Sequence, residues 1–273
     1  MEKIEFCKMN GSGNDFILID NRDGKVDEGS MSRLVERVCR RRESLGADGV
    51  IFVNDSDDYD FSWKYFNADG GEVEMCGNGG RCVARFAYLK GIAGNSMTFE
   101  TLAGPISAEV TDRIVKVLMP LPSRLKTDIN LSLKPGWISV DFINTGVPHV
   151  VVQVDNLDDY PVLEQGMAIR YHSMFSPEGT NANFVNIIGP ESIKTRTYER
   201  GVEDETLACG TGAVAAALIA NARGLVSSPV RVLTKGGEEL KVYFQKERDL
   251  FCKVWLEGST SLVCEGQLHE EAL

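Results

Sequence analysis

Histidine is scarce in this chain, and no two of its cysteines form a CxxC pair. The only histidines among the 273 residues are His149, His172 and His269. Zinc sites are usually built from closely spaced Cys and His ligands, and a Ser-His-Asp triad needs a histidine beside its nucleophile. The sequence therefore favours neither a metal site nor a serine hydrolase.

Long hydrophobic runs are also missing. The longest apolar run is Ala213 to Ala220, whereas a membrane helix needs about 20 apolar residues. The N-terminal MEKIEFCKMNGSGNDF alternates apolar with polar residues and lacks the apolar stretch of a signal peptide. We therefore expect a cytoplasmic protein that does not bind a membrane.

Positive charge is in deficit, and nucleotide-binding motifs are incomplete. The chain has 40 acidic and 29 basic side chains, a net charge of −11, which does not favour nucleic-acid binding. Gly11-x-Gly13 and Gly77-x-Gly79 lack the third glycine of a dinucleotide fingerprint, and there is no P-loop. An odd number of cysteines, seven, argues for reduced thiols rather than a disulfide framework.

What the chain does contain is one motif written twice. Cys76 opens CGNGGRCVARFAYLKG and Cys209 opens CGTGAVAAALIANARG. When the cysteines are superposed, other positions coincide: Gly77/Gly210, Gly79/Gly212, Ala84/Ala217, Ala87/Ala220, Gly91/Gly224, and beyond the motif Tyr65/Tyr198, Thr101/Thr234 and Gly104/Gly237. A constant offset over this length favours duplication.

The pattern predicts two α+β domains, each wrapping a mostly antiparallel sheet or barrel around a central helix begun by its cysteine. Expected helices span 32–42, 78–90 and 162–171, with strands between them. Pro120 and Pro122 mark the crossing between domains. We place the first domain at 1–118, with Cys76, and the second at 119–273, with Cys209. A last strand at about 260–268 is a candidate to return to the first domain.

A cysteine at a helix N-terminus meets unpaired backbone N–H groups and the positive end of the helix dipole, which stabilise its thiolate. The small residues after Cys76 and Cys209 let backbone donors approach an anion such as a substrate carboxylate. Inversion of a stereocentre needs a base on one face of the carbon and an acid on the other. Two duplicated thiols, one ionised and one protonated, supply both. The other cysteines are expected to be buried apolar residues: Cys7, Cys39, Cys252 and Cys264. Cys82, six positions after Cys76 in the same helix, is expected to point away from the site.

Further polar candidates lie near the second motif. Arg200 has the planar fork that binds a carboxylate, and Glu199 is able to accept from an ammonium or to tune a thiol; a surface ion pair is the equally good alternative. His149 alone is more often structural than catalytic. Asn14, Asn67 and Asn181 read first as turn residues.

These residues resemble the diaminopimelate epimerase family, whose members are cofactor-independent amino-acid epimerases of lysine and peptidoglycan-precursor synthesis. The resemblance runs through KMNGSGNDF, GADG, YFNADGGEVEMCGNGGRC, TGVPH, GTNANFV and YERGVEDETLACGTGA. It implies interconversion of LL- and meso-2,6-diaminopimelate by a homodimer, without metal or pyridoxal phosphate.

The resemblance also implies residue roles. Cys76 and Cys209 are the expected acid/base pair, and His149 and Glu199 are the expected modulators of the thiol pKa values. The expected substrate-binding residues are Asn14, Asn67, Gly77, Asn78, Asn181, Glu199, Arg200, Gly210 and Thr211, with Arg200 near the distal carboxylate. Gly49 and Val147 differ from some family members, which have Gln and Asn there.

Two alternatives stay open from the residues themselves. One is a racemase of another amino acid, of the histidine or proline type, in which Arg200 matters less. The other is a thiol-disulfide switch or binding module that uses the same two cysteines.

Overall fold

The computed structural model describes residues 3–133, 136–248 and 250–272. The chain divides into two compact units. Unit 1 consists of Met1–Val117 and Gly258–Leu273, and unit 2 consists of Leu118–Glu257. The C-terminal residues therefore belong to unit 1, where the last strand pairs with the first.

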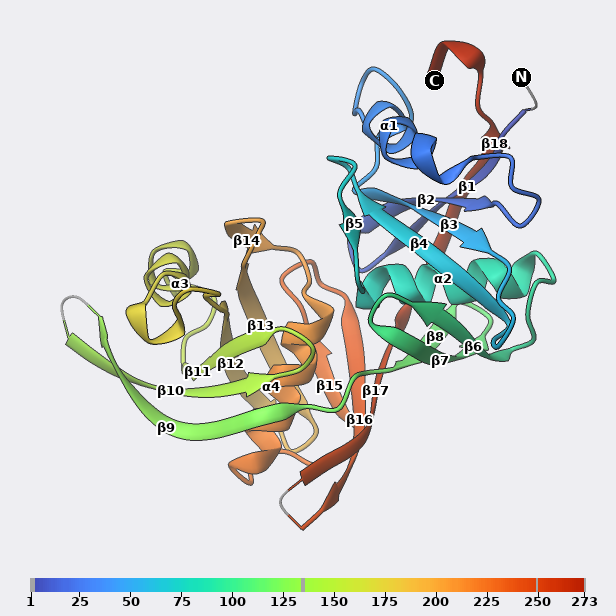
Figure 1. Ribbon diagram of the computed structural model, residues 1–273. Coiled ribbons are helices and arrows are strands. Elements are labelled where there is room, and N and C mark those ends of the chain that lie inside the picture. Colours follow the sequence, from blue (N-terminus) through green and yellow to red (C-terminus); the bar gives the residue numbers. More distant parts are fainter. Residues whose placement is uncertain (1–2, 134–135, 249, 273) are drawn as a thin grey trace. The chain divides into compact units, whose positions relative to one another are not determined.

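Unit 1 is a mixed sheet with two helices. Strand β1 pairs with β18 and β2, β2 runs parallel to β3, and the order continues through β4, β6, β7 and β8. Helix α2 contacts β1, β2, β3 and β7, whereas α1 contacts β4 (Figure 1). The elements are β1 (Glu5–Gly11), β2 (Asn14–Asp20), α1 (Glu28–Val38), β3 (Gly49–Asn54), β4 (Phe61–Asn67), β5 (Glu72–Val73), α2 (Gly77–Leu89), β6 (Ser96–Thr101), β7 (Gly104–Thr111), β8 (Ile114–Leu118), β18 (Ser261–Gln267) and the 3-10 turn η2 (Glu270–Ala272).

Unit 2 repeats this plan. Strand β10 pairs with β9 and β11, β11 runs parallel to β12, and the order continues through β13, β15, β16 and β17. Helix α4 contacts six of these strands, and α3 contacts β12, β13 and β14. The elements are β9 (Ser123–Leu133), β10 (Gly136–Asn144), β11 (Pro148–Gln153), α3 (Val162–Arg170), η1 (Ser173–Phe175), β12 (Asn181–Gly189), β13 (Ser192–Glu199), β14 (Asp204–Thr206), α4 (Gly210–Ala222), β15 (Val230–Leu233), β16 (Glu239–Glu247) and β17 (Leu250–Ser259).

Corresponding strands pair in the same order and with the same parallel steps, so the predicted duplication extends from sequence to topology. The parallel pairs β2–β3 and β4–β6 of unit 1 match β11–β12 and β13–β15 of unit 2. Both α2 and α4 have 13 residues and begin directly after their cysteines. The expected α+β class, with a largely antiparallel sheet around a central helix in each half, is confirmed.

The central strands of each sheet are buried on both faces because a helix covers either side. In β3, Val50 and Phe52 join the core under α1, while the alternate residue Ile51 points to the first turn of α2. In unit 2, Ala182 and Phe184 of β12 join the core with residues of α3, and Asn183 points the other way, to α4. The first turn of each central helix thus rests on the inner residues of its sheet.

One predicted helix has the wrong bounds. Helix α1 spans Glu28–Val38 instead of the expected 32–42, because the buried stripe already starts at Met31 and Cys39 caps the C-terminus. Arg42 has a φ of 74°, which a right-handed helix does not allow.

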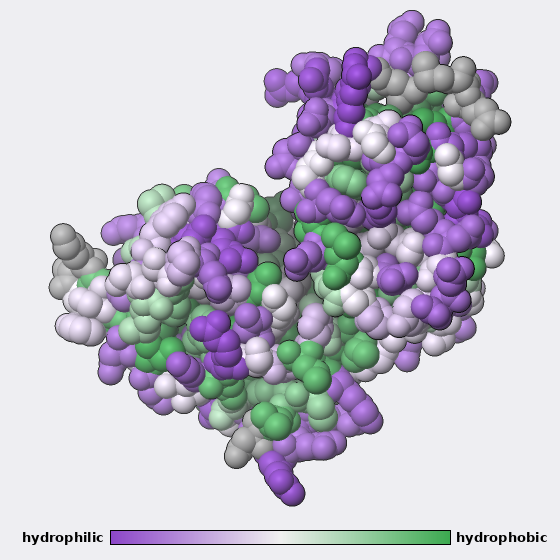
Figure 2. Space-filling view, viewed as in Figure 1, coloured by the Kyte–Doolittle hydropathy of each residue, from purple (hydrophilic) through white to green (hydrophobic). Residues whose placement is uncertain are grey.

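The exterior agrees with the high charge of the sequence. Figure 2 shows hydrophilic residues over much of the visible face, with smaller hydrophobic areas between them. Within the described ranges, no helix combines the length and apolar character that a membrane crossing requires.

Candidate active site

Cys76 is the N-cap residue of α2. Its backbone is extended, with φ −140° and ψ 119°, and its Sγ accepts a hydrogen bond from the Gly79 N–H at 3.4 Å. The side chain is half-buried. A sulfur that accepts from a backbone N–H at a helix N-terminus is placed to carry negative charge.

A chain of side-chain hydrogen bonds fixes the residue two positions after Cys76. The Asn78 amide donates to Asn14 Oδ1 at 2.8 Å, and the Asn14 amide donates to Asp48 Oδ2 at 2.9 Å. Arg81, which is fully buried, donates to Asn78 Oδ1 at 2.9 Å and to the Ser12 hydroxyl. Asn14 and Asn78 thus lie side by side, and the network holds the backbone of the first helical turn in place.

Asn67 lies at the exposed end of β4. Its Oδ1 accepts from the Tyr65 hydroxyl at 2.7 Å, and its backbone N–H bonds to the Gly71 carbonyl. The structure thus ties Asn67 to Tyr65 and to the turn that leads toward Cys76.

Cys209 occupies the matching place in unit 2, with φ −121° and ψ 111° before α4. Its Sγ lies 3.5 Å from the Thr211 hydroxyl. Burial raises the pKa of the Glu199 carboxyl, and a hydrogen bond between that carboxyl and the Cys209 side chain acts in the opposite direction. Cys209, Thr211 and Glu199 therefore form one cluster.

Asn181 connects the other predicted residues of unit 2. Its amide donates to the Pro148 carbonyl at 3.0 Å, and its Oδ1 accepts from the Arg200 N–H at 2.8 Å. The Arg200 guanidinium donates to the Glu178 carbonyl at 3.1 Å through one of its five N–H groups. Asn181 thereby orders the backbone next to both His149 and Arg200.

His149 is completely buried in β11. Its Nδ1 lies 3.0 Å from the Asn183 amide nitrogen, and its Nε2 has no hydrogen-bond partner among the described residues. Burial, reinforced by the charge of Arg200, lowers the pKa of His149 to about 3. The ring is therefore neutral at physiological pH.

The sequence did not single out Asn183, Asp48 or Arg81, although each organises one of the two sites. Asn183 and Asn181 are two apart in GTNANFV, so a strand places them on one face. That spacing was the available signal, but the partner His149 lies 34 residues away.

Gly49, which differs from some members of the family that the sequence resembles, is closely packed against the neighbouring strand. A Cβ at Gly49 would overlap the Phe66 carbonyl oxygen of the neighbouring strand. Since that oxygen is backbone, Gly49 cannot accept a side chain without a shift of the strand pair. Val147 is half-buried in the turn before β11.

The remaining cysteines divide into two groups. Cys7, Cys39 and Cys82 are buried, and burial raises the pKa of both Cys7 and Cys39 to about 12. The expectation of burial is wrong for Cys264, which is exposed on β18, and for Cys252, which is half-buried on β17.

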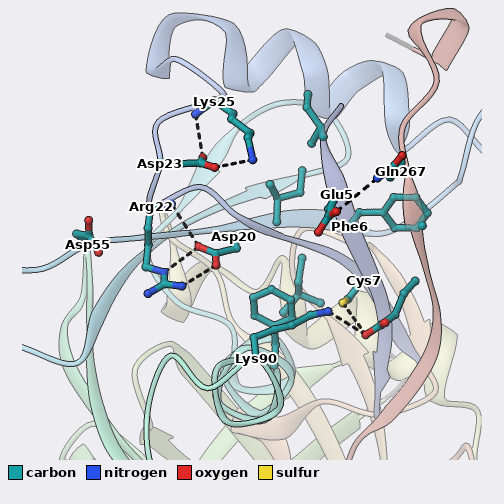
Figure 3. Close-up of a pocket in the computed structure, with 16 residues that line it drawn as sticks. Glu5, Phe6, Cys7, Asp20, Arg22, Asp23, Lys25, Asp55, Lys90 and Gln267 are labelled. Carbon is teal, nitrogen blue, oxygen red and sulfur yellow. Dashed lines mark hydrogen bonds and ion pairs between the residues drawn. The ribbon is translucent and has the colours of Figure 1, made fainter. Parts of the chain in front are cut away.

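A cavity of about 700 Å³ in unit 1 contains none of the predicted site residues. It is lined by the C-terminal end of α2, at Phe86 and Lys90, and by β1, β2 and the 265–267 segment. Figure 3 shows several of its charged side chains in ion pairs, Arg22 with Asp20 and Lys25 with Asp23. The cavity lies at the opposite end of α2 from Cys76.

Solved structures share this fold. The Bacillus anthracis phenazine biosynthesis protein of the PhzF family matches with a TM-score of 0.76 and 18% identity over 98% of this chain and 100% of that chain. A probable proline racemase from Agrobacterium radiobacter K84 matches with a TM-score of 0.71 and 16% identity, over 98% and 93%. The chain therefore has the fold of PhzF and racemase-type proteins. In this chain a cysteine caps the central helix of each half.

Sequence comparison narrows this class to one family. The family model described as diaminopimelate epimerase matches residues 6–124 and 142–256. A protein named diaminopimelate epimerase from Aquifex aeolicus (strain VF5) is 48% identical over 281 residues, with 99% of each chain covered. The chain belongs to the diaminopimelate epimerase family and is an isomerase, which favours the first interpretation over the other racemases and the thiol switch.

Proposed function

We propose that this chain interconverts LL- and meso-2,6-diaminopimelate, a step of lysine biosynthesis, by moving protons between one α-carbon and two thiols. The observation that carries the mechanism is the pair of cysteines, Cys76 and Cys209, each at the N-cap of a duplicated helix. The mechanism requires both thiols to reach opposite faces of the same carbon.

The hydrogen bonds at the two sulfurs support different starting states. Cys76 accepts from the Gly79 N–H, and acceptance favours the ionised form of a group. The Cys209 side chain is hydrogen-bonded to the Glu199 carboxyl, whose pKa is raised by burial, and we assign the proton at Cys209 to the thiol in the starting state. Cys76 then removes the α-proton while Cys209 delivers one to the other face, and the reverse reaction exchanges the roles.

The carbanion that forms needs stabilisation of its adjacent carboxylate. We assign this to the helix N-termini, through the N–H groups of Gly77, Asn78, Gly210 and Thr211. Preorganised donors of this kind cost no reorganisation during the reaction. The Asn14–Asn78 bond at 2.8 Å is one contact that keeps such donors fixed.

The remaining predicted residues are assigned to the rest of the substrate. Asn14, Asn67 and Asn181 each retain hydrogen-bonding capacity beyond the bonds described above, because an amide offers two donors and two acceptor sites. Glu199 and Arg200 offer opposite charges to the substrate, and Arg200 is assigned to the distal carboxylate. We expect a cytoplasmic homodimer. Sedimentation at assay concentrations measures whether the protein is a dimer.

Single replacements of the two cysteines test the mechanism. Cys76→Ser and Cys209→Ser should each abolish interconversion. In deuterated water each variant should still exchange the α-hydrogen of one epimer only, and that epimer should differ between the two variants. Cys252→Ser, a half-buried cysteine of unit 2, is the control and should retain full activity. Full activity in either site variant would refute the assignment.

A further inference from the structure

The layer beneath the first helical turn differs in kind between the two units. In unit 2 that layer contains His149, Asn183 and Thr197, with exposures of 0%, 0% and 3%. Asn183 opposes Thr197 across β12 and β13, and its Oδ1 lies against Gly212, the third residue of α4. This is a buried, fully polar layer.

The matching layer in unit 1 is apolar. Ile51 opposes Tyr65 across β3 and β4 and lies against Gly79, the third residue of α2. Tyr65 therefore occupies the place of Thr197, and the sequence match of Tyr65 with Tyr198 is wrong by one residue. Phe16 pairs with Gly49, two residues before Ile51. In the same way His149 pairs with Asn181, two residues before Asn183. Phe16 therefore occupies the place of His149. The Phe16 and Tyr65 rings pack edge to face with centroids 5.8 Å apart. Unit 1 therefore builds the layer beneath its cysteine-capped helix from Phe16, Ile51 and Tyr65, without a buried amide or imidazole in that layer.

Burying polar groups costs free energy unless every group is hydrogen-bonded. Since unit 1 shows that the architecture does not require them, the polar layer of unit 2 serves something other than folding. One atom of the layer, His149 Nε2, has no partner among the described residues, which by itself costs about 1–3 kcal/mol.

The orientation of the Asn183 amide follows from its neighbours. One atom of the amide lies 2.9 Å from the Val150 carbonyl oxygen, which only accepts, so this atom must be the NH2 group. The other atom is then the oxygen, which accepts from the Thr197 hydroxyl at 3.0 Å. Because the same NH2 group lies 3.0 Å from His149 Nδ1, that ring nitrogen accepts and carries no hydrogen.

We propose that Asn183, oriented by Thr197 and the Val150 carbonyl, is a positioning residue that holds His149 as the neutral tautomer with its hydrogen on Nε2. The ring then offers one N–H donor and no charge, and that donor bonds to an anion of the loaded site, a thiolate or a substrate carboxylate. This assignment deepens the proposed function and rests on it for the identity of that anion.

Nitrogen NMR of the substrate-free protein labelled at histidine tests the tautomer without reference to catalysis. The chain has only three histidines, so His172→Gln and His269→Gln identify the His149 signals. At neutral pH we expect an unprotonated Nδ1 and a protonated Nε2. A hydrogen on Nδ1, or a charged ring, would overturn the inference even in a fully active enzyme.

Asn183→Asp tests the consequence, because a carboxylate only accepts and requires a hydrogen on Nδ1. The His149 signals should switch, and kcat should fall about 10- to 100-fold, the range for lost partners that fix a ligating histidine, with a smaller change in KM. Asn186→Asp, on the same strand but bonded to the Val154 and Asp155 carbonyls, should change neither. An unchanged kcat in Asn183→Asp despite a switched tautomer would contradict the proposed role.

Asn183→Leu provides a second variant in case the acidic one does not fold, since unit 1 carries the aliphatic Ile51 at this place. It removes the donor to Nδ1, so mixed tautomers and a reduced kcat are expected. A single Nε2–H tautomer in this variant would show that Asn183 does not control the ring. If the tautomer results hold but Cys76→Ser remains fully active, the proposed function fails and the tautomer assignment stands.

Discussion

Gly212 is the position where the contact between helix α4 and its sheet can be tested most sharply. A Cβ built at Gly212 overlaps Asn183 Oδ1 and lies 3.2 Å from both Cβ and Sγ of Cys209. Asn183 cannot retreat easily, because Thr197, Val150 and His149 all bond to its amide. We therefore expect Gly212→Ala to destabilise the fold and to displace Cys209.

Gly80→Ala is the matched control for this substitution. A Cβ at Gly80 meets nothing closer than 3.6 Å, and the repeat places Ala213 at the equivalent position of α4. Both substitutions lie in the first turn of a 13-residue helix, so both gain up to about 1 kcal/mol of helix propensity. The difference between the variants isolates the overlap, which overpacking data place at about 1–3 kcal/mol.

Thermal and denaturant unfolding measure the difference. Gly80→Ala should unfold at or above the wild-type temperature, and Gly212→Ala should unfold lower, at about 2–4 °C for each kcal/mol. Gly79→Ala should fall between them, because its nearest contact, at 3.2 Å, is the flexible end of Ile51. Equal stability of Gly212→Ala and Gly80→Ala would refute the packing described for Asn183.

Other predictions concern charge and packing. Arg196 forms a two-pronged ion pair with Glu205 at 2.6 and 2.8 Å and also donates to three carbonyl groups of the 157–160 segment. Arg196→Met should lower the free energy of unfolding in urea by about 3–5 kcal/mol. Arg22→Met, at the partly exposed pair with Asp20, is the control and should lower it by at most about 1 kcal/mol. The pKa of His149 is about 3 in the folded chain and about 6.5 unfolded, so its contribution to stability is complete above pH 6.5 and is lost as the pH falls toward 3, by up to about 1.4 kcal/mol per pH unit. His149→Phe should flatten this part of the stability profile, and an unchanged profile would contradict the buried neutral ring. A Cβ at Gly166 of α3 would overlap the Tyr198 side chain, so Gly166→Ala should lower stability by about 1–3 kcal/mol in the same assay, and wild-type stability would count against that close contact.

The repeated motif predicted the parts of the fold nearest to the thiols. Helices α2 and α4 start at Gly77 and Gly210, within a residue or two of the expected start, because an apolar segment follows each cysteine and the repeat marks the same start twice. Helix α1 was misplaced because its apolar stripe alone does not show where the chain leaves helical geometry, which here depends on Cys39 and Arg42. Strand β9 has a weak sequence signal, because most of its residues are exposed and buried positions alternate little along it.

The supporting side chains were harder to predict than the thiols. Asn183 becomes interpretable only when β11 and β12 pair in parallel and bring His149 beside it. The network of Asp48, Asn14, Asn78 and Arg81 likewise joins three separate segments of unit 1. Such contacts depend on strand register and on helix rotation, which local patterns do not specify.

Deuterium incorporation during the first turnovers tests the two-base transfer most directly. With protiated LL-diaminopimelate in deuterated water, the meso product formed early should carry deuterium at the inverted carbon, while the unreacted LL substrate stays protiated. Starting from the meso form, the LL product should show the same pattern. Deuterium entering unreacted substrate as fast as product, or an inverted product that keeps its original hydrogen, would contradict transfer between two separate thiols.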